Sequence, residues 1–193
     1  KTIGARDIRL VGGNVKIYNC DFVNMSDPAG TDGKAIYGTS AAQTDSLIIV
    51  GCTFANIVKQ GILFEANTTQ PGAVKYVSIE NSTFNTIGAE ALYIDDADDN
   101  LTTPGPILVM NHVTLHNTNR ILIHKSDYNI IRNTIFTNTP NIGNNSYYIY
   151  GDNSYVTNSL WFNASVNMHA GKALNMVNAD PGYADAANGD FSL

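Results

Sequence analysis

The sequence predicts an all-β fold, a single right-handed parallel β-helix of about six to seven rungs that covers residues 1–193. Three observations predict this fold. A segment typified by VSIENSTFNTI occurs in six copies along the chain. Within each copy the apolar residues alternate at period two, which is the periodicity of a strand. The copies recur at intervals of 21 to 32 residues, and repeats of that length are typical of solenoids.

Alignment of the copies produces three columns of like residues. The first apolar column contains Ile17, Ile49, Ile79, Met110, Ile131 and Val156. The second, five positions later, contains Phe22, Phe54, Phe84, Leu115, Phe136 and Trp161. A polar column lies between them, with Asn19, Gly51, Asn81, His112, Asn133 and Asn158. Asparagine suits a bend because its amide tolerates unusual backbone angles, and we expect the amides to bond to one another along the stack.

A second strand follows each copy, so each rung is expected to carry about three short strands. These second strands are expected at residues 35–40, 62–67, 92–97, 121–126, 148–153 and 173–178. Their alignment places Glu65, Asp95 and His124 in one column, with Asp96 and Lys125 beside it. Such a column suits acid/base catalysis, contact with sugar or calcium, or plain charge pairing on an outer surface.

Aromatic residues accompany these charged residues on the second strands. Tyr93 and Tyr150 are the two for which we predict contact with a polysaccharide substrate, together with Glu65. Tyrosine rings suit stacking against sugar rings because they combine an apolar face with a polar hydroxyl. The alternative is that these tyrosines fill the core.

An acidic run follows the third of these strands. Asp95, Asp96, Asp98 and Asp99 bring several carboxylates together within five positions. Calcium takes six to eight oxygen ligands, so these four residues are the predicted metal ligands and Ca²⁺ is the possible cofactor. The spacing is not that of an EF-hand, and a solvated acidic loop is the alternative.

Cys20 and Cys52 fall in the same column of adjacent copies, one place after the polar column. Neighbouring parallel strands lie about 4.8 Å apart, which is within the Cα range of a disulfide. Two stacked free thiols are the alternative. A metal site is not expected, since two cysteines without a nearby histidine supply half a ligand set.

Composition limits the partners and the location. The chain has 193 residues, a net charge of −6 and 44% hydrophobic residues, which suit one domain with a sizeable core. Four arginines and the acidic balance argue against nucleic acid. No apolar run is long enough to span a membrane. The content of Asn, Thr, Ser and Gly is compatible with an extracellular or cell-surface location.

The two ends of the chain carry expectations of their own. The chain begins at Lys1 with one strand of an incomplete rung, so we expect additional N-terminal domains to cover the exposed backbone. Residues 178–193 contain turn signals and are expected to cap the last rung.

The Asn-bearing copies and the C-terminal DP, NGDF and final Leu resemble the right-handed parallel β-helix proteins of the polysaccharide-lyase superfamily, in particular secreted bacterial proteins related to chondroitinase B and alginate lyase. The resemblance covers nearly the whole chain. Its sharpest part is ILIHKSDYNIIRNTIF at 121–136, similar to a family segment in which a Lys-Ser pair ends a strand and an Asn-rich strand follows.

The resemblance implies β-elimination on an acidic, uronic-acid polysaccharide, with Lys125 as the catalytic base. His124, from the aligned column, and Arg132 are the further predicted catalytic residues. The family's acidic calcium ligands lie five and seven residues before the lysine, positions held here by Arg120 and Thr118. A non-catalytic glycan-binding or structural module of a larger cell-surface protein is therefore the alternative. An ice-binding or adhesin β-helix is a third class, since Thr53, Thr83 and Thr114 occupy one column of three consecutive copies.

Overall fold

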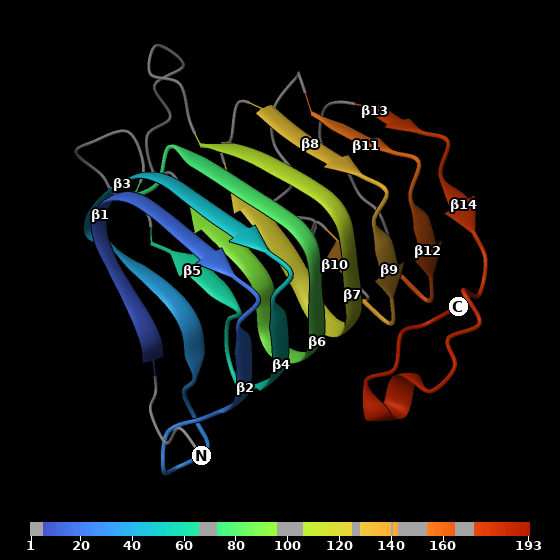
Figure 1. Ribbon diagram of the computed structural model, residues 1–193, viewed down its shortest axis with the longest axis horizontal. Helices are drawn as coiled ribbons and strands as arrows, with labels where there is room; N and C mark the ends of the chain where they lie inside the picture. Colours follow the sequence, from blue (N-terminus) through green and yellow to red (C-terminus); the bar gives the residue numbers. More distant parts are fainter. Residues whose placement is uncertain are drawn as a thin grey trace.

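The computed structural model describes residues 6–65, 73–95, 106–124, 128–139, 141–142, 154–164 and 172–193. These residues form an all-β structure with one 14-stranded sheet, in which every pairing between named strands is parallel (Figure 1). The strands are β1 (Arg6–Tyr18), β2 (Asp21–Met25), β3 (Lys34–Val50), β4 (Thr53–Ile57), β5 (Ile62–Phe64), β6 (Tyr76–Asp95), β7 (Ile107–His124), β8 (Tyr128–Arg132), β9 (Ile135–Thr137), β10 (Asn141–Ile142), β11 (Tyr155–Thr157), β12 (Leu160–Phe162), β13 (Lys172–Leu174) and β14 (Val177–Asn178). Within the described ranges the helical element is a short 3₁₀ turn at Ala186–Asn188, and no helix there is long and apolar enough to cross a membrane.

The strand pairings divide the sheet into three stacks, which we call faces A, B and C. Face A contains the C-terminal parts of β1 and β3, the first residues of β6 and β7, and then β8, β11 and β13. Face B contains β2, β4, the middle of β6 and β7, β9, β12 and β14. Face C contains the N-terminal parts of β1 and β3, β5, the ends of β6 and β7, and β10. The chain passes through the faces in the order A, B, C, and Figure 1 shows the long strands β6 and β7 bending as they pass from one to the next.

Two bends separate the faces, and both use the left-handed backbone region that asparagine tolerates better than most residues. The bend between A and B has φ values of 47° to 66°, at Asn19, Gly51, Asn81, His112, Asn133, Asn158 and Asn175. The predicted polar column is therefore confirmed as a bend. The bend between B and C lies five residues later, with φ of 48° to 57°, at Asn24, Asn56, Thr86, Asn117, Asn138 and Asn163. The sequence reading had missed this second column.

Amide side chains bond along the stack at both bends, as predicted for the first bend and not predicted for the second. The Asn56 amide donates to Asn24 Oδ1 at 3.2 Å, and the Asn175 amide donates to Asn158 Oδ1 at 3.0 Å. We call one passage of the chain through faces A, B and C a row. Each bond joins one row to the next, so the bends contribute side-chain hydrogen bonds in addition to the backbone ladder.

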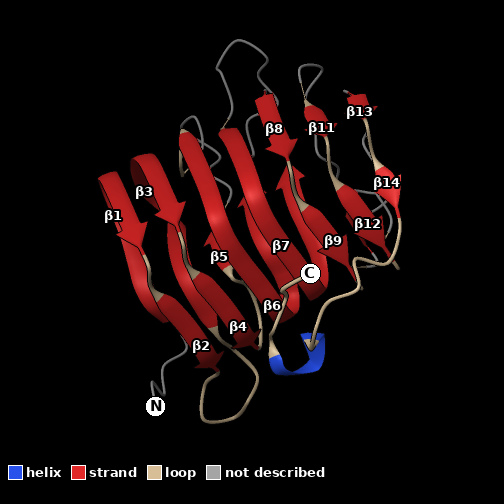
Figure 2. Ribbon diagram, turned by 45° about the vertical axis from the view of Figure 1, so that its right-hand side comes forward, coloured by secondary structure: helices blue, strands red, loops and turns tan. Residues whose placement is uncertain are grey.

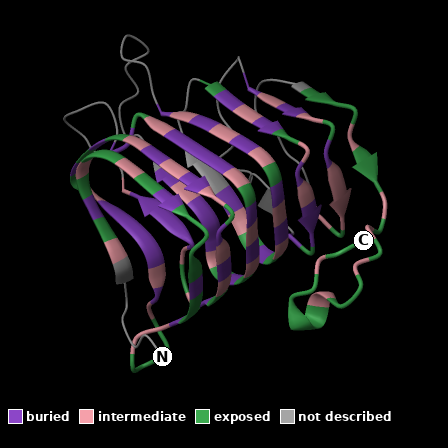
Figure 3. Ribbon diagram, viewed as in Figure 1, coloured by how far each residue is buried: buried purple, intermediate pink, exposed green. Residues whose placement is uncertain are grey.

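The core is a continuous stack of apolar side chains, and both predicted apolar columns are confirmed by the register. The ring centroids of Phe22 and Phe54 lie 4.8 Å apart and those of Phe54 and Phe84 lie 4.5 Å apart, with the rings nearly parallel. The column continues through Leu115, Phe136 and Trp161. Figure 3 shows buried residues recurring along the strands from β1 to β11, whereas the described residues of β13 and β14 at the end of the stack are exposed.

The residue after the first bend caps a backbone carbonyl in most rows. The Ser82 hydroxyl donates to the Glu80 carbonyl at 2.7 Å and accepts the backbone N–H of Cys52 at 3.1 Å. Cys52 holds the equivalent position in the preceding row, directly after the bend residue Gly51, and its thiol lies 3.5 Å from the Val50 carbonyl oxygen. Both cysteines are free, so the free-thiol alternative holds over the disulfide.

Two expectations about the elements were wrong. Residues 173–178 are not a second strand: β13 pairs with β11 on face A and β14 pairs with β12 on face B, on either side of the bend at Asn175. This segment is a seventh copy of the repeat, concealed because Asn178 occupies the column that holds an aromatic residue or leucine in the other copies. The expected segments 35–40 and 62–67 align Ala35 with Ile62. In the structure Ile36 pairs with Ile62, so that alignment is one residue out of register.

The C-terminal segment does not cap the last row. Leu174 and Val177 are 48% and 56% exposed, and the chain beyond them turns back over the outer side of face B (Figure 2). There the rings of Tyr183 and Phe191 pack beside His116 of β7. Contact with face B removes part of these two rings from water, and this burial explains why the segment lies there.

Candidate functional site

The predicted column of Glu65, Asp95 and His124 agrees with the backbone register at the end of face C. Asp95 of β6 is the Cα partner of His124 of β7, and Phe64 of β5 is the partner of Ile94 of β6. Glu65 follows Phe64 directly, so the three residues hold equivalent positions in successive rows, about 4.8 Å apart per row. For Asp95 and His124 the structure describes the backbone position.

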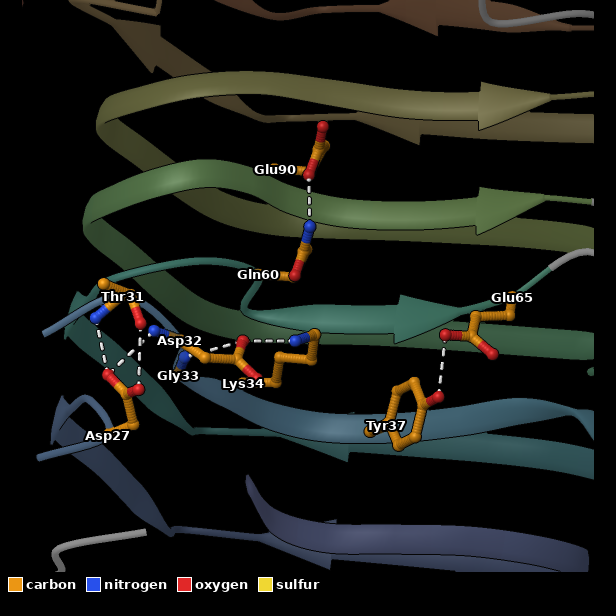
Figure 4. A network of polar contacts seen from close by, with 9 residues as sticks. All are labelled: Asp27, Thr31, Asp32, Gly33, Lys34, Tyr37, Gln60, Glu65 and Glu90. Carbon is orange, nitrogen blue, oxygen red and sulfur yellow. Dashed lines mark hydrogen bonds and ion pairs between the residues drawn. The ribbon is translucent and has the colours of Figure 1, made fainter. Parts of the chain in front are cut away.

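Glu65 is a carboxylate held in place by a neighbouring strand. The buried Tyr37 of β3 donates its hydroxyl to Glu65 Oε1 at 2.7 Å (Figure 4). Glu65 is half-buried, and its second oxygen, Oε2, has no hydrogen-bond partner among the described residues. The side chain is therefore oriented by one oxygen and offers the other as an acceptor for a ligand hydroxyl or N–H group.

A second carboxylate, Glu90, lies at the beginning of face C and is only 2% exposed. Arg120 Nε donates to Glu90 Oε1 at 2.6 Å, and the guanidinium also forms an ion pair with that oxygen. Gln60 Nε2 donates to Glu90 Oε2 at 2.8 Å (Figure 4). Both carboxylate oxygens are occupied and the charge is paired, as a buried charge requires. This network joins three rows and leaves Glu90 with no free oxygen for a ligand.

Thr118 and Arg120 hold the two positions at which the resemblance implies carboxylate ligands for calcium, and both side chains bond to other residues of the chain. The Thr118 hydroxyl is buried and bonds to the Thr139 hydroxyl at 3.1 Å, and Arg120 supplies a positive charge to Glu90. Within the described ranges, no group of three His, Cys, Asp or Glu side chains is placed to hold a metal ion. The donor set there does not fit calcium, and the predicted ligands Asp96, Asp98 and Asp99 lie outside the described residues.

The other predicted site residues are placed as follows. Lys125 and Tyr150 lie outside the described residues. Tyr93 is half-buried in β6, between Leu63 of β5 and Leu122 of β7 in the register. Arg132 is exposed at the end of β8 on face A, beside Asn111 and Thr157, whereas His124 ends β7 on face C. The register therefore brings Glu65, Asp95 and His124 together and places Arg132 on another face.

The sequence reading missed both Tyr37 as the partner of Glu65 and the Glu90–Arg120 pair. The signal for the pair is positional, because Gln60 and Glu90 each stand six residues after a phenylalanine of the second apolar column, and Arg120 stands five after Leu115. Comparison with known proteins gives no significant match, either to a protein-family model or to a curated protein.

Proposed function

We propose that the chain is a right-handed parallel β-helix that binds polysaccharide along the end of face C. The helical architecture is supported by the recurrence of faces A, B and C in the same order, with seven strands of face A in succession. Seven rows agree with the six to seven rungs expected from the repeat.

The observation that carries the binding proposal is the Oε2 atom of Glu65, which has no hydrogen-bond partner among the described residues. Sugar hydroxyls donate hydrogen bonds to carboxylates, and such charge-assisted bonds are stronger than those between neutral groups. Tyr37 fixes the carboxylate before a ligand arrives, which lowers the entropy lost on binding. The equivalent positions of Asp95 and His124 repeat polar groups at the spacing of the rows, so the site extends along the stack as a polymer requires.

The balance of charge favours a neutral or weakly charged polysaccharide. Lys34, Lys75 and Arg120 are all engaged in ion pairs with carboxylates of the chain. The net charge of −6 also repels a polyanion over a Debye length of about 8 Å at physiological salt. This proposal includes an extracellular or cell-surface location, because that is where a polysaccharide-binding module meets its ligand. It also includes further N-terminal domains.

Lyase chemistry is a second candidate, favoured by the register of Asp95 with His124, the residue next to Lys125. In that reaction Lys125 removes the proton beside a uronate carboxylate and the C–H electron pair forms a carbon–carbon double bond. The glycosidic C–O bond breaks, and the leaving oxygen keeps its electron pair and takes up a proton from water. His124 and Arg132 are the further residues predicted to take part in this reaction. Calcium on the acidic segment 95–99 remains a proposal for this candidate alone.

The two candidates are separated by testing one panel of soluble polysaccharides in two ways. Affinity gel electrophoresis detects binding, and ultraviolet absorbance detects the unsaturated uronides released by a lyase, each with and without millimolar calcium. The binding proposal predicts retardation by at least one polysaccharide without product. Absorbance from alginate, pectate or chondroitin that disappears in Lys125→Ala would establish the lyase instead, and no retardation with any polysaccharide would overturn the binding proposal.

A further inference from the structure

The C-terminal segment and the outer side of face B enclose a hollow of about 490 Å³. Strand residues from β4 and β6 form its floor, and the segment 187–191 forms a wall. The lining residues are Thr53, Ala55, Asn56, Thr83, Asn85, Thr86, Ala187, Asn188, Gly189 and Phe191. The volume is within the usual range of about 300–1,000 Å³ for small-molecule sites.

The wall is held in a defined place by contacts outside the hollow. The rings of Tyr183 and Phe191 meet edge to face at 5.0 Å, and the Phe191 ring lies 5.3 Å from that of His116. Asp185 caps the 3₁₀ turn by accepting the backbone N–H of Asn188, and the backbones of Asp185 and Asp190 bond to each other in both directions. The C-terminal segment lies over face B (Figure 2). The contacts among the rings of Tyr183, Phe191 and His116 hold this folded element there.

The chemistry of the lining indicates the ligand. None of the ten residues carries an ionisable side chain, so the hollow offers no charge to an anion or a cation. The hydroxyls of Thr53 and Thr83 and the amide nitrogen of Asn85 make no hydrogen bond to any described residue, and Asn85 Oδ1 accepts from Thr86. The Phe191 ring adds an apolar surface of the kind on which a sugar ring packs.

The spacing of these groups is set by the sheet. Thr53 and Thr83 are Cα partners in adjacent rows, about 4.8 Å apart, a distance comparable to that between alternate hydroxyls of a pyranose ring. A second hollow of about 300 Å³, lined by residues that include Asn117 and Asn138, shares Thr86 with the first. The two hollows together can hold consecutive units of one oligosaccharide.

We propose that this hollow is a binding site for an uncharged pyranose, with Thr53, Thr83 and Asn85 as hydrogen-bonding groups and Phe191 as the stacking surface. The site lies on face B, away from the column of Glu65, Asp95 and His124 on face C, and it does not depend on binding at that column.

Nuclear magnetic resonance of the full chain tests the proposal with cellobiose, maltose, mannobiose and xylobiose as probes. We expect at least one to shift the backbone amide signals of Thr53, Thr83, Asn85 and Asn188 as a group, without shifts near Glu65. Thr83→Val keeps the shape of the side chain and removes the hydroxyl, so it should weaken that binding about fivefold, the effect of one hydrogen bond.

Thr114→Val is the matched control, because Thr114 lies in the same column one row further on but outside the hollow. It should leave the affinity unchanged. The proposal is overturned if none of the four disaccharides shifts the group of signals, or if Thr114→Val weakens binding as much as Thr83→Val does. Loss of polysaccharide retardation with this response intact would refute only the function proposed for face C.

Discussion

Two glutamates on face C differ in what surrounds them, and the difference separates a structural role from a binding role. Glu90 is buried, with an arginine on one oxygen and a glutamine on the other. Glu65 is half-buried, with a tyrosine on one oxygen and the second oxygen free among the described residues. A charge with all its acceptors occupied stabilises one arrangement of the rows, whereas a charge with one free acceptor is available to a ligand.

His116 is the residue whose titration should be visible in stability. Its Nδ1 lies 2.8 Å from the Thr137 hydroxyl, and burial lowers its pKa from the usual 6.5. The pKa of the adjoining Tyr183 is raised, and burial is the largest cause. A side-chain hydrogen bond with Thr137 acts in the opposite direction, and the charge of Asp180 adds to the rise. Because the folded protein disfavours the protonated imidazole, the stability that depends on neutral His116 is present above pH 6.5 and is lost as the pH falls through the folded pKa.

Thermal melting between pH 7.5 and pH 5, at constant ionic strength, checks this expectation. We predict that the melting temperature of the wild type falls toward pH 5 and that the fall is smaller in His116→Asn. His112→Asn is the control, since His112 is exposed at a bend position that asparagine fills in other rows, and it should retain the full fall. Equal falls in all three proteins would show that His116 does not titrate in this way.

At the scale of the element, the bend between faces A and B is a unit that the sequence repeats. An asparagine supplies the left-handed residue, and the next side chain donates to the carbonyl two residues earlier, as in Ser82, Thr134 and Ser159. Cysteine replaces the hydroxyl in the first two rows, and burial raises the pKa of the Cys52 thiol, so it remains a protonated donor.

Substitution of Cys52 tests whether the donor is what the bend requires. Cys52→Ser restores the residue found in the next row, so we expect the free energy of unfolding to change by less than about 1 kcal/mol. Cys52→Ala leaves the Val50 carbonyl without its side-chain donor and should cost about 1–3 kcal/mol. Urea denaturation of the two variants measures the difference, and an alanine variant as stable as the serine variant would refute the capping role.

The same elements show how far a sequence can predict a structure of this kind. The apolar columns and the first bend were predictable because identical residue types mark each row, and register follows from them. The bend between faces B and C was visible in Asn24, Asn117, Asn138 and Asn163, yet was overlooked. The contact of Tyr37 with Glu65 was not predicted because it is diagonal: Tyr37 is the register partner of Leu63, and its hydroxyl reaches Glu65 two residues further along the chain.

At the scale of the whole molecule, the unpredictable part is the path of the C-terminal segment. The predicted turn signals of this segment are local: Asp180 accepts the backbone N–H of Gly182, and Asn188-Gly189 ends the 3₁₀ turn. The packing of Tyr183 and Phe191 against His116 joins residues far apart in the sequence. Nothing in the segment itself distinguishes a cap on the last row from a cover on face B. The candidate sugar site under that segment was beyond sequence reasoning for the same reason.

The stacking of rows can be tested in solution by disulfide formation. In a background with Cys20→Ser and Cys52→Ser, the pair Thr53→Cys and Thr83→Cys places two thiols on adjacent rows, about 4.8 Å apart between Cα atoms and within disulfide range. We expect this pair to cross-link under mild oxidation, as read by mass spectrometry. The pair Thr53→Cys and Thr114→Cys is separated by two rows and should stay reduced, so a disulfide between them would contradict the register.

The central claim is that face C binds polysaccharide through Glu65, and isothermal titration calorimetry of Glu65→Gln tests it most directly. The ligand is the polysaccharide that most retards the wild type, and the matched variant is Glu80→Gln, which removes a half-buried carboxylate from face A. Loss of a hydrogen bond to a charged group should weaken binding by Glu65→Gln at least about tenfold, with Glu80→Gln equal to the wild type. Affinities that are the same in all three proteins, or equally weakened in both variants, would contradict the claim.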